Sequence, residues 1–178
     1  MTRHFLLTGL PGCGKTTVIR TIAARLQAAG ALVRGFWTAE MREGGVRAGF
    51  RIETVGGRTG TLARVGLAGP HRVGRYGVDI ASFESVGVQE VEEALVEGAG
   101  GGIEVLVIDE IGKMELCSPR FREAVARAFA VVPHVVATVM QRSHPWADAV
   151  KARPDARLLT VTARNREHLP EEVLRALL

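Results

Sequence analysis

A nine-residue stretch near the start of the chain restricts its fold more than any other feature. It reads GLPGCGKTT at positions 9–17 and fits the pattern GxxxxGK[ST]. A short apolar run, residues 4–9, precedes it, and residues 16–30 follow with apolar side chains at helical spacing. A strand, a tight loop and a helix in this order place backbone N–H groups and a helix N-terminus around an anion. We therefore predict a phosphate-binding loop.

The residue types in this loop suggest separate roles. Lys15 is expected to reach the β- and γ-phosphates of a nucleotide, and the Thr16 hydroxyl is expected to ligate Mg²⁺. Thr17 either touches the α-phosphate or caps the first helical turn. The other residues expected to surround the phosphates are Gly9, Leu10, Pro11, Gly12, Cys13 and Gly14.

Length and composition are those of an ordinary folded protein. The chain has 178 residues, of which 47% are hydrophobic and 24% are charged, so we expect one domain over residues 1–178. No apolar run is long enough to span a bilayer, and the N-terminal segment lacks the pattern of a secretory signal. The two cysteines form no disulfide or metal-ligand pattern. We expect a cytoplasmic monomer without membrane contact.

Strand and helix patterns alternate along most of the chain, which predicts an α/β fold with a mainly parallel sheet and helices on both faces. The expected strands are residues 4–9, 31–40, 102–109, 134–140 and 157–162, and the expected helices are residues 16–30, 82–98, 118–130 and 170–178. Ser118 is expected to cap the helix that follows it.

Residues from about 42 to 80 differ in composition and pattern: they are rich in glycine, and apolar and polar residues alternate with period two. Val46, Ala48, Phe50 and Ile52 would share one face of a strand. We predict antiparallel β-hairpins inserted into the α/β chain; the alternative is a low-complexity linker.

An aliphatic run, residues 105–108, leads directly into two adjacent acids. A phosphate loop needs an acid from another strand to hold Mg²⁺, and Asp109 is placed to supply it. Glu110 is either the general base that polarises an attacking water or a structural carboxylate. The acidic pair resembles that of one large division of phosphate-loop proteins. In that division an extra strand separates the strand before the phosphate loop from the strand before the acids. Residues 31–40 are our candidate for that strand.

Charge on the transferring phosphoryl group also needs a cation. Lys113 follows the acidic pair and is one candidate; alternatively it is a solvated lysine paired with Glu115. Arg72 and Arg75 are two more candidates, from a stretch that holds seven arginines between positions 42 and 75.

Five stretches together carry a family resemblance. They are TGLPGCGKTT (8–17), GFWTAEMREGGVRAGFRIETVGG (35–57), RVGRYGVDI (72–80), VIDEIGKMEL (107–116) and VTARNREHLP (161–170). The chain resembles the THEP-type nucleoside-triphosphatases, the family that includes the cancer-related nucleoside-triphosphatase. The resemblance implies a three-layer, RecA-like P-loop fold and Mg²⁺-dependent hydrolysis of ATP, GTP and other nucleoside triphosphates to the diphosphate and phosphate.

The same resemblance extends the candidate site. It places residues 9–16 on the triphosphate, with Asp109, Glu110 and Gly112 beside it. It also makes Asn165 and Arg166 candidates for contacts near the base or ribose, although a helix-capping role for Asn165 stays open.

Two other functions remain as alternatives. A nucleoside or RNA-end kinase would use the same γ-phosphate, and the arginine-rich region could then form an acceptor pocket. An ATP switch stimulated by nucleic acid or a partner is not favoured, because the aromatic residues, 5% of the chain, are not interleaved with the arginines. A GTPase of the switch type would carry an NKxD motif, which the sequence lacks.

Overall fold

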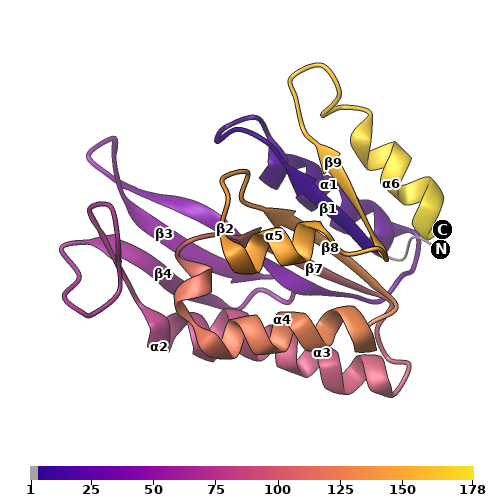
Figure 1. Cartoon of the computed structure of the whole chain (residues 1–178), viewed down its shortest axis with the longest axis horizontal. Helices are drawn as coiled ribbons and strands as arrows, with labels where there is room; N and C mark the ends of the chain where they lie inside the picture. Colours follow the sequence, from indigo (N-terminus) through magenta and orange to yellow (C-terminus); the bar gives the residue numbers. More distant parts are fainter. Residues whose placement is uncertain (1–3) are drawn as a thin grey trace.

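The computed structural model describes residues 4–178. Its strands form one nine-stranded sheet in the order β5-β6-β4-β3-β2-β7-β8-β1-β9, with helices on both faces (Figure 1). This confirms the predicted α/β fold. None of the helices in this range combines the length and the apolar character needed to cross a membrane.

The parallel half of the sheet contains both motif strands. Strand β1 (His4–Thr8) lies between β8 (His134–Val139) and β9 (Ala156–Thr160), β8 pairs with β7 (Val105–Ile111), and β7 pairs with β2 (Val33–Glu43). All four pairings are parallel. The carboxyl ends of these strands therefore meet at one edge of the sheet, where the phosphate loop and the acidic pair both lie.

The expected position of residues 31–40 between the two motif strands is wrong. Strand β2 lies on the far side of β7, and β8 separates β1 from β7. The separating strand thus comes from later in the chain. Order along the chain does not fix order in a parallel sheet, because each crossover helix can return the chain to either side.

The other half of the sheet is antiparallel and confirms the hairpin prediction. It consists of β3 (Val46–Thr54), β4 (Thr59–Val65), β6 (Tyr76–Val78) and β5 (Arg72–Val73). Antiparallel pairing already begins at Phe36, opposite Thr54, so one strand serves both halves and the change comes before residue 42. Ile52 is fully buried, but Val46 is 59% exposed because it lies beside the hairpin turn.

Two hydrophobic layers enclose the sheet. On one face lie α1 (Lys15–Ala28) and α6 (Leu169–Leu177), packed on Phe5 and Leu7 of β1. The opposite face, which receives Leu6, carries the remaining helices. These are α2 (Ile80–Phe83), the π-helical segment η1 (Glu84–Val88), α3 (Gln89–Ala99), the 3₁₀ segment η2 (Glu115–Cys117), α4 (Pro119–Val131) and α5 (Pro145–Lys151).

Helix ends follow local chemistry. The Ser118 hydroxyl accepts a hydrogen bond of 3.0 Å from the Phe121 N–H, which confirms the predicted cap. Helix α5 was not predicted, because seven residues are too few to establish a helical period. Its start is marked by Pro145 in the first turn and by the His144 ring, which accepts from the Trp146 N–H.

Gly35 lies in β2 opposite Val107 of β7, at a place where no side chain fits. Its φ is +134°, and a Cβ there would lie 1.8 Å from the Val107 carbonyl oxygen. We expect Gly35→Ala to destabilise the protein by at least about 4–5 kcal/mol, measured by urea denaturation. Gly57→Ala is the matched control, since φ is +90° but nothing lies within 4 Å. It should cost about 1 kcal/mol or slightly more. Equal losses in the two variants would show that the close approach at Gly35 is unimportant.

Candidate functional site

The phosphate loop connects β1 to α1 by a sharply turned backbone. Gly9, Gly12 and Gly14 have φ of +150°, +77° and +104°, which glycine adopts most readily. A Cβ on Gly9 would lie 2.7 Å from the Val161 carbonyl oxygen and 2.9 Å from Cys13 Sγ. The loop therefore packs tightly against the end of β9, while its tip, Leu10, is 66% exposed.

Helix α1 begins directly after this loop. Its N-cap, Gly14, provides no side-chain cap, so the alternative in which Thr17 caps the helix is wrong. The first-turn N–H groups and the positive end of the helix dipole thus face the loop, as an anion site requires. Lys15 Nζ donates to the carbonyl oxygens of Gly9 (3.0 Å) and Leu10 (3.1 Å), which places its ammonium over the loop.

Asp109 links the acidic pair to the phosphate loop through hydrogen bonds. Its carboxylate accepts from the Thr16 hydroxyl at 2.8 Å and from the Thr138 hydroxyl at 2.6 Å. Burial raises the pKa of Asp109, whereas hydrogen bonds from Thr138, Thr16 and the Thr38 backbone and the charge of Lys15 lower it. Thr138 was not predicted as a site residue; its only signal is a hydroxyl within the apolar run of β8.

Glu110 lies beside Asp109 and is only partly buried. Pairing of β7 with β8 is irregular between Ile108 and Ile111, so the simple alternation of a strand does not decide where the acidic pair points. The peptide bond joining the two acids is cis. Burial and the charge of Asp109 raise the pKa of Glu110, and the charge of Lys15 lowers it. Glu110 therefore experiences both the other acid and the loop lysine.

A third carboxyl group completes the loop after β7. Glu115 is only 4% exposed, and a Cβ on Gly112 would lie 3.1 Å from Glu115 Oε2 and 3.3 Å from Glu110 Cδ. Both carboxyl groups thus flank Gly112. Burial, then the charges of Glu110 and Asp109, raise the pKa of Glu115 well above its usual range. Lys113 is exposed and makes no ion pair with Glu115, so that proposed pairing is wrong.

Glu115 should make the stability of the folded protein depend on pH. A carboxyl whose pKa is raised by folding stabilises the protein fully below its unfolded pKa, and this is lost as pH rises towards the folded pKa. The side chain in Glu115→Gln cannot ionise, so the variant should not lose stability in this way as pH rises. The melting temperature of the variant relative to the parent should therefore rise as pH increases above the ordinary pKa of a glutamate, about 4.3. Each kcal/mol of stability that the parent loses should correspond to about 2–4 °C.

The matched control for this titration is Glu123→Gln, since Glu123 is exposed on α4. Substitution at this exposed position should change the melting temperature little. A difference between Glu115→Gln and the parent that does not change with pH would contradict the assignment.

Arg72 and Arg75 lie far from the loop, so their candidacy as cations at the transferring phosphoryl group is wrong. Strand β5 forms the sheet edge, five strand spacings from β7, or roughly 24 Å. Arg75 instead donates to the Arg47 carbonyl oxygen at 2.9 Å. The sequence could not reveal this distance, because it depends on the order in which the hairpins join the sheet.

A pocket of about 480 Å³ lies beside the start of α1. Its lining residues are Gly14, Thr17, Val18, Thr21, Arg166, Glu167 and Pro170. Arg166 packs on the loop, since a Cβ on Gly14 would lie 3.2 Å from Arg166 Cδ. The structure thus brings one of the two residues predicted near the base or ribose to the phosphate loop.

Asn165 has a different position in the same segment. Its amide donates to the Thr160 carbonyl oxygen and accepts from the Thr162 N–H, both at 2.8 Å. Helix α6 begins later, after His168, so the capping alternative is wrong. Asn165 instead braces the loop that carries Arg166.

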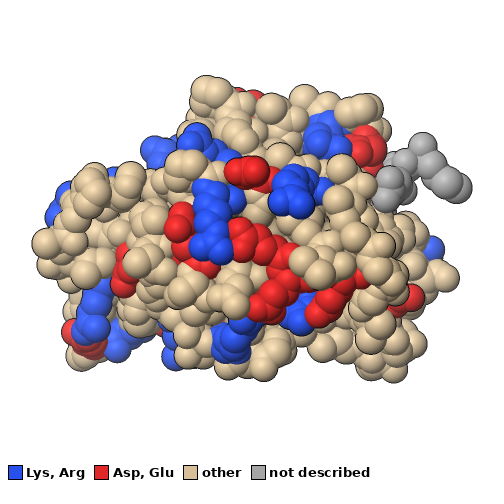
Figure 2. Space-filling model, turned by 90° about the horizontal axis from the view of Figure 1, so that it is seen from below, with Lys and Arg blue, Asp and Glu red and all other residues tan. Residues whose placement is uncertain are grey.

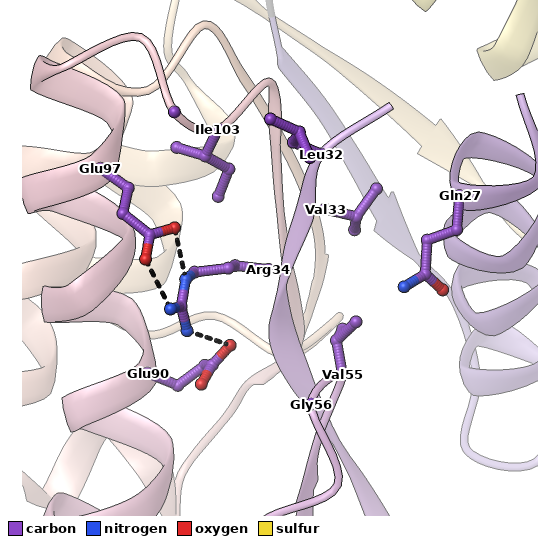
Figure 3. Close-up of a pocket in the computed structure, with 10 residues that line it drawn as sticks. Gln27, Leu32, Val33, Arg34, Val55, Gly56, Glu90, Glu97 and Ile103 are labelled. Atoms are coloured by element: carbon purple, nitrogen blue, oxygen red, sulfur yellow. Dashed lines mark hydrogen bonds and ion pairs between the residues drawn. The ribbon is translucent and has the colours of Figure 1, made fainter. Parts of the chain in front are cut away.

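A second pocket, of about 330 Å³, lies at the opposite edge, by the amino ends of β2 and β7. Arg34 points from β2 towards α3 and binds Glu97 at 2.7 Å and Glu90 at 3.3 Å (Figure 3). Positive and negative groups also interleave over the face that carries α3 and α4 (Figure 2), where Arg120 binds Glu92. These cations are neutralised by neighbours, so we assign this region a structural role.

The donor atoms around Asp109 suit one particular kind of metal site. No group of three His, Cys, Asp or Glu side chains within residues 4–178 is arranged to hold an ion. Thr16 and Asp109 instead offer two adjacent oxygen ligands next to the phosphate loop. Mg²⁺ is typically bound by one or two protein oxygens, with substrate phosphates and waters as the other ligands. The residues present therefore fit a divalent cation held jointly with a nucleotide.

Comparisons with known proteins identify the family of this chain. The profile of the NTPase family matches residues 4–174. Nucleoside-triphosphatase THEP1 of Thermotoga sp. (strain RQ2) is 44% identical, over 97% of this chain and 94% of that protein. The human cancer-related nucleoside-triphosphatase is 39% identical, over 98% and 96% of the two chains.

Solved structures lead to the same family. The crystal structure of THEP1 from Aquifex aeolicus superposes with a TM-score of 0.88 at 37% identity, covering 98% of each chain. The solution structure of a human cancer-related nucleoside triphosphatase gives a TM-score of 0.84 at 39% identity, covering 99% and 97%. Because the family profile matches residues 4–174 and relatives of 37–44% identity align over nearly the whole length, this chain belongs to the NTPase family.

Proposed function

We propose that this protein hydrolyses ATP, GTP and other nucleoside triphosphates to the diphosphate and phosphate, with Mg²⁺ and with little preference among bases. The observation that carries the proposal is the hydrogen bond between Thr16 and Asp109, 2.8 Å long, with Glu110 adjacent. It joins a phosphate cradle, a metal-binding oxygen pair and a candidate base at one edge of the sheet. The names of the relatives support the same reaction.

The phosphate loop positions the triphosphate. Backbone N–H groups of residues 9–17 and the α1 N-terminus surround the phosphates, while Lys15 places a positive charge near the β- and γ-oxygens. Thr16 and Asp109 would hold Mg²⁺, which when bound neutralises charge on the β- and γ-phosphates. Thr138 orients Asp109 for this task.

Glu110 then orients the attacking water and accepts its proton. The oxygen of that water forms a bond to the γ-phosphorus as the bond to the bridging oxygen breaks, which releases the diphosphate. The raised pKa of Glu110 brings its basicity closer to neutral pH than that of an ordinary glutamate. Activity should accordingly increase as pH rises through this elevated pKa.

The pocket beside Gly14 supports a broad choice of base. Val18 and Pro170 give it apolar surface, and the Thr21 hydroxyl is already bonded to the Thr17 carbonyl oxygen at 2.9 Å. Such a surface suits stacking against any base better than reading of one base edge. No NKxD motif is present to select guanine.

Release of inorganic phosphate from ATP, GTP, CTP and UTP tests the proposal. With Mg²⁺ we expect kcat/KM values within about tenfold of one another, since stacking discriminates weakly. A preference of about a hundredfold or more for one base would overturn the broad specificity. Release that does not depend on a divalent cation would overturn the metal assignment.

The kinase alternative loses its structural support. Its acceptor pocket was expected among the arginines of the hairpins, but Arg42 and Arg47 pair with Glu40, and Arg64 pairs with Glu43. These ion pairs also lie on the antiparallel half of the sheet, away from the loop.

A further inference from the structure

The loop that follows β8, residues 140–144, leaves the sheet between the phosphate loop and the acidic pair formed by Asp109 and Glu110. Strand β8 has β1 on one side, with Leu7 opposite Thr138, and β7 on the other, with Ile111 opposite Val139. Its carboxyl end thus lies between the start of the phosphate loop and the segment that carries Glu110. Figure 1 shows this loop and the phosphate loop at the same edge of the sheet.

The backbone of this loop is held from both sides. The Met140 N–H donates to the Ile111 carbonyl oxygen at 3.0 Å, and Lys151 Nζ donates to the Gln141 carbonyl oxygen at 3.5 Å. On the other side, the His144 N–H donates to the Asp148 carboxylate at 3.1 Å. Arg142 is therefore presented from an anchored backbone, within about 10 Å of chain from the end of β8.

The Arg142 side chain itself is uncommitted. It is exposed, and within residues 4–178 it takes part in no hydrogen bond or ion pair. Most arginines of this chain do the opposite: Arg34, Arg58 and Arg120 each bind glutamates. An anchored but unpaired guanidinium at this edge is available for an anionic ligand, and its planar fork suits phosphate oxygens.

Other cations at this edge have different positions. Arg166 lies against Gly14, on the side of the base pocket. Lys113 lies three residues after Glu110, in the loop that leaves β7, and Arg164 lies in the loop after β9, beyond β1 in the strand order. Only the loop after β8 leaves the sheet between the cradle and the acidic pair, which is where the γ-phosphate must lie for Glu110 to aim a water at it.

We propose that Arg142 is a catalytic residue that binds the γ-phosphate oxygens as the bond to the leaving diphosphate breaks. This inference rests on the proposed function of the same site. Arg142 neither gains nor loses a proton; its fixed positive charge offsets the negative charge that shifts during transfer. No residue of a partner is needed to supply this charge.

Two substitutions test the role. Arg142→Ala should lower kcat about 10²–10³-fold and leave KM within about threefold, because the contact forms mainly in the transition state. Arg142→Lys should recover part of kcat, since it restores charge but not the fork. Arg127→Ala, which removes an exposed arginine near the carboxyl end of α4, should leave both constants unchanged.

A second readout separates catalysis from folding. Arg142→Ala should melt like the parent and bind a non-hydrolysable triphosphate normally, yet fail to trap the diphosphate with aluminium fluoride, a mimic of the transferring phosphoryl group. A loss of kcat below about threefold, or unchanged trapping, would overturn the inference.

The outcome also distinguishes this inference from the hydrolase proposal. If the parent transfers phosphate to an acceptor rather than to water, the hydrolase proposal fails. Arg142→Ala should then slow that transfer by the same factor, because the same phosphoryl group is in motion. Transfer at the parental rate would overturn the role of Arg142 independently.

Discussion

Replacement of Glu110 by glutamine is expected to lower kcat by about 10²–10⁴-fold while nucleotide affinity stays within about threefold of the parent. Glutamine keeps the size of the side chain but accepts no proton at neutral pH. The phosphate contacts made by Lys15 and the loop backbone do not depend on Glu110, so binding should persist. Affinity can be measured by calorimetry with a non-hydrolysable triphosphate, and kcat by phosphate release.

Glu123→Gln on α4 removes the same charge from an exposed position and should behave like the parent. If Glu110→Gln retains full turnover, the base lies elsewhere. Glu115 is then the next carboxyl to examine, because it flanks the other side of Gly112.

Lys15→Ala is expected to lose both binding and turnover. Lys15 is the cation nearest to the loop carbonyls, and a charge-assisted contact to phosphate is typically worth about 1.5–3 kcal/mol. We therefore expect nucleotide affinity to fall about 10–100-fold and kcat to fall further, because charge on the γ-phosphate grows during transfer.

The control for Lys15→Ala is Arg127→Ala, which removes one positive charge from α4 and should change neither constant. Parental affinity in Lys15→Ala would mean that the loop does not hold the triphosphate. The two site variants thus separate binding from chemistry, since only one of them should bind normally.

The parts of the fold that were predicted correctly are governed by local chemistry. The motif at residues 9–17 specifies strand, loop and helix within a few residues, and Gly30, with φ of +89°, ends the helix as expected. Ser118 and Pro119 likewise mark the start of α4. Period-two alternation was sufficient to indicate the hairpins, because each hairpin pairs segments that are close in sequence.

The features that were missed depend on contacts between distant segments. Strand β8 takes the place between the motif strands that was assigned to residues 31–40, and it brings Thr138 to Asp109 across 29 positions of sequence. Burial of Glu115 beside Glu110 follows from how the loop folds over Gly112. Neither is encoded in a spacing that can be read along the chain.

Isotope transfer from water tests the central claim most directly. In H₂¹⁸O, a single turnover with excess enzyme should place one ¹⁸O atom in the released phosphate and none in the diphosphate, as mass spectrometry can determine. That result requires water to attack the γ-phosphorus, the step assigned to Glu110, and Glu110→Gln should give the same labelling at a much lower rate. Phosphate without ¹⁸O, or diphosphate that contains it, would contradict the account.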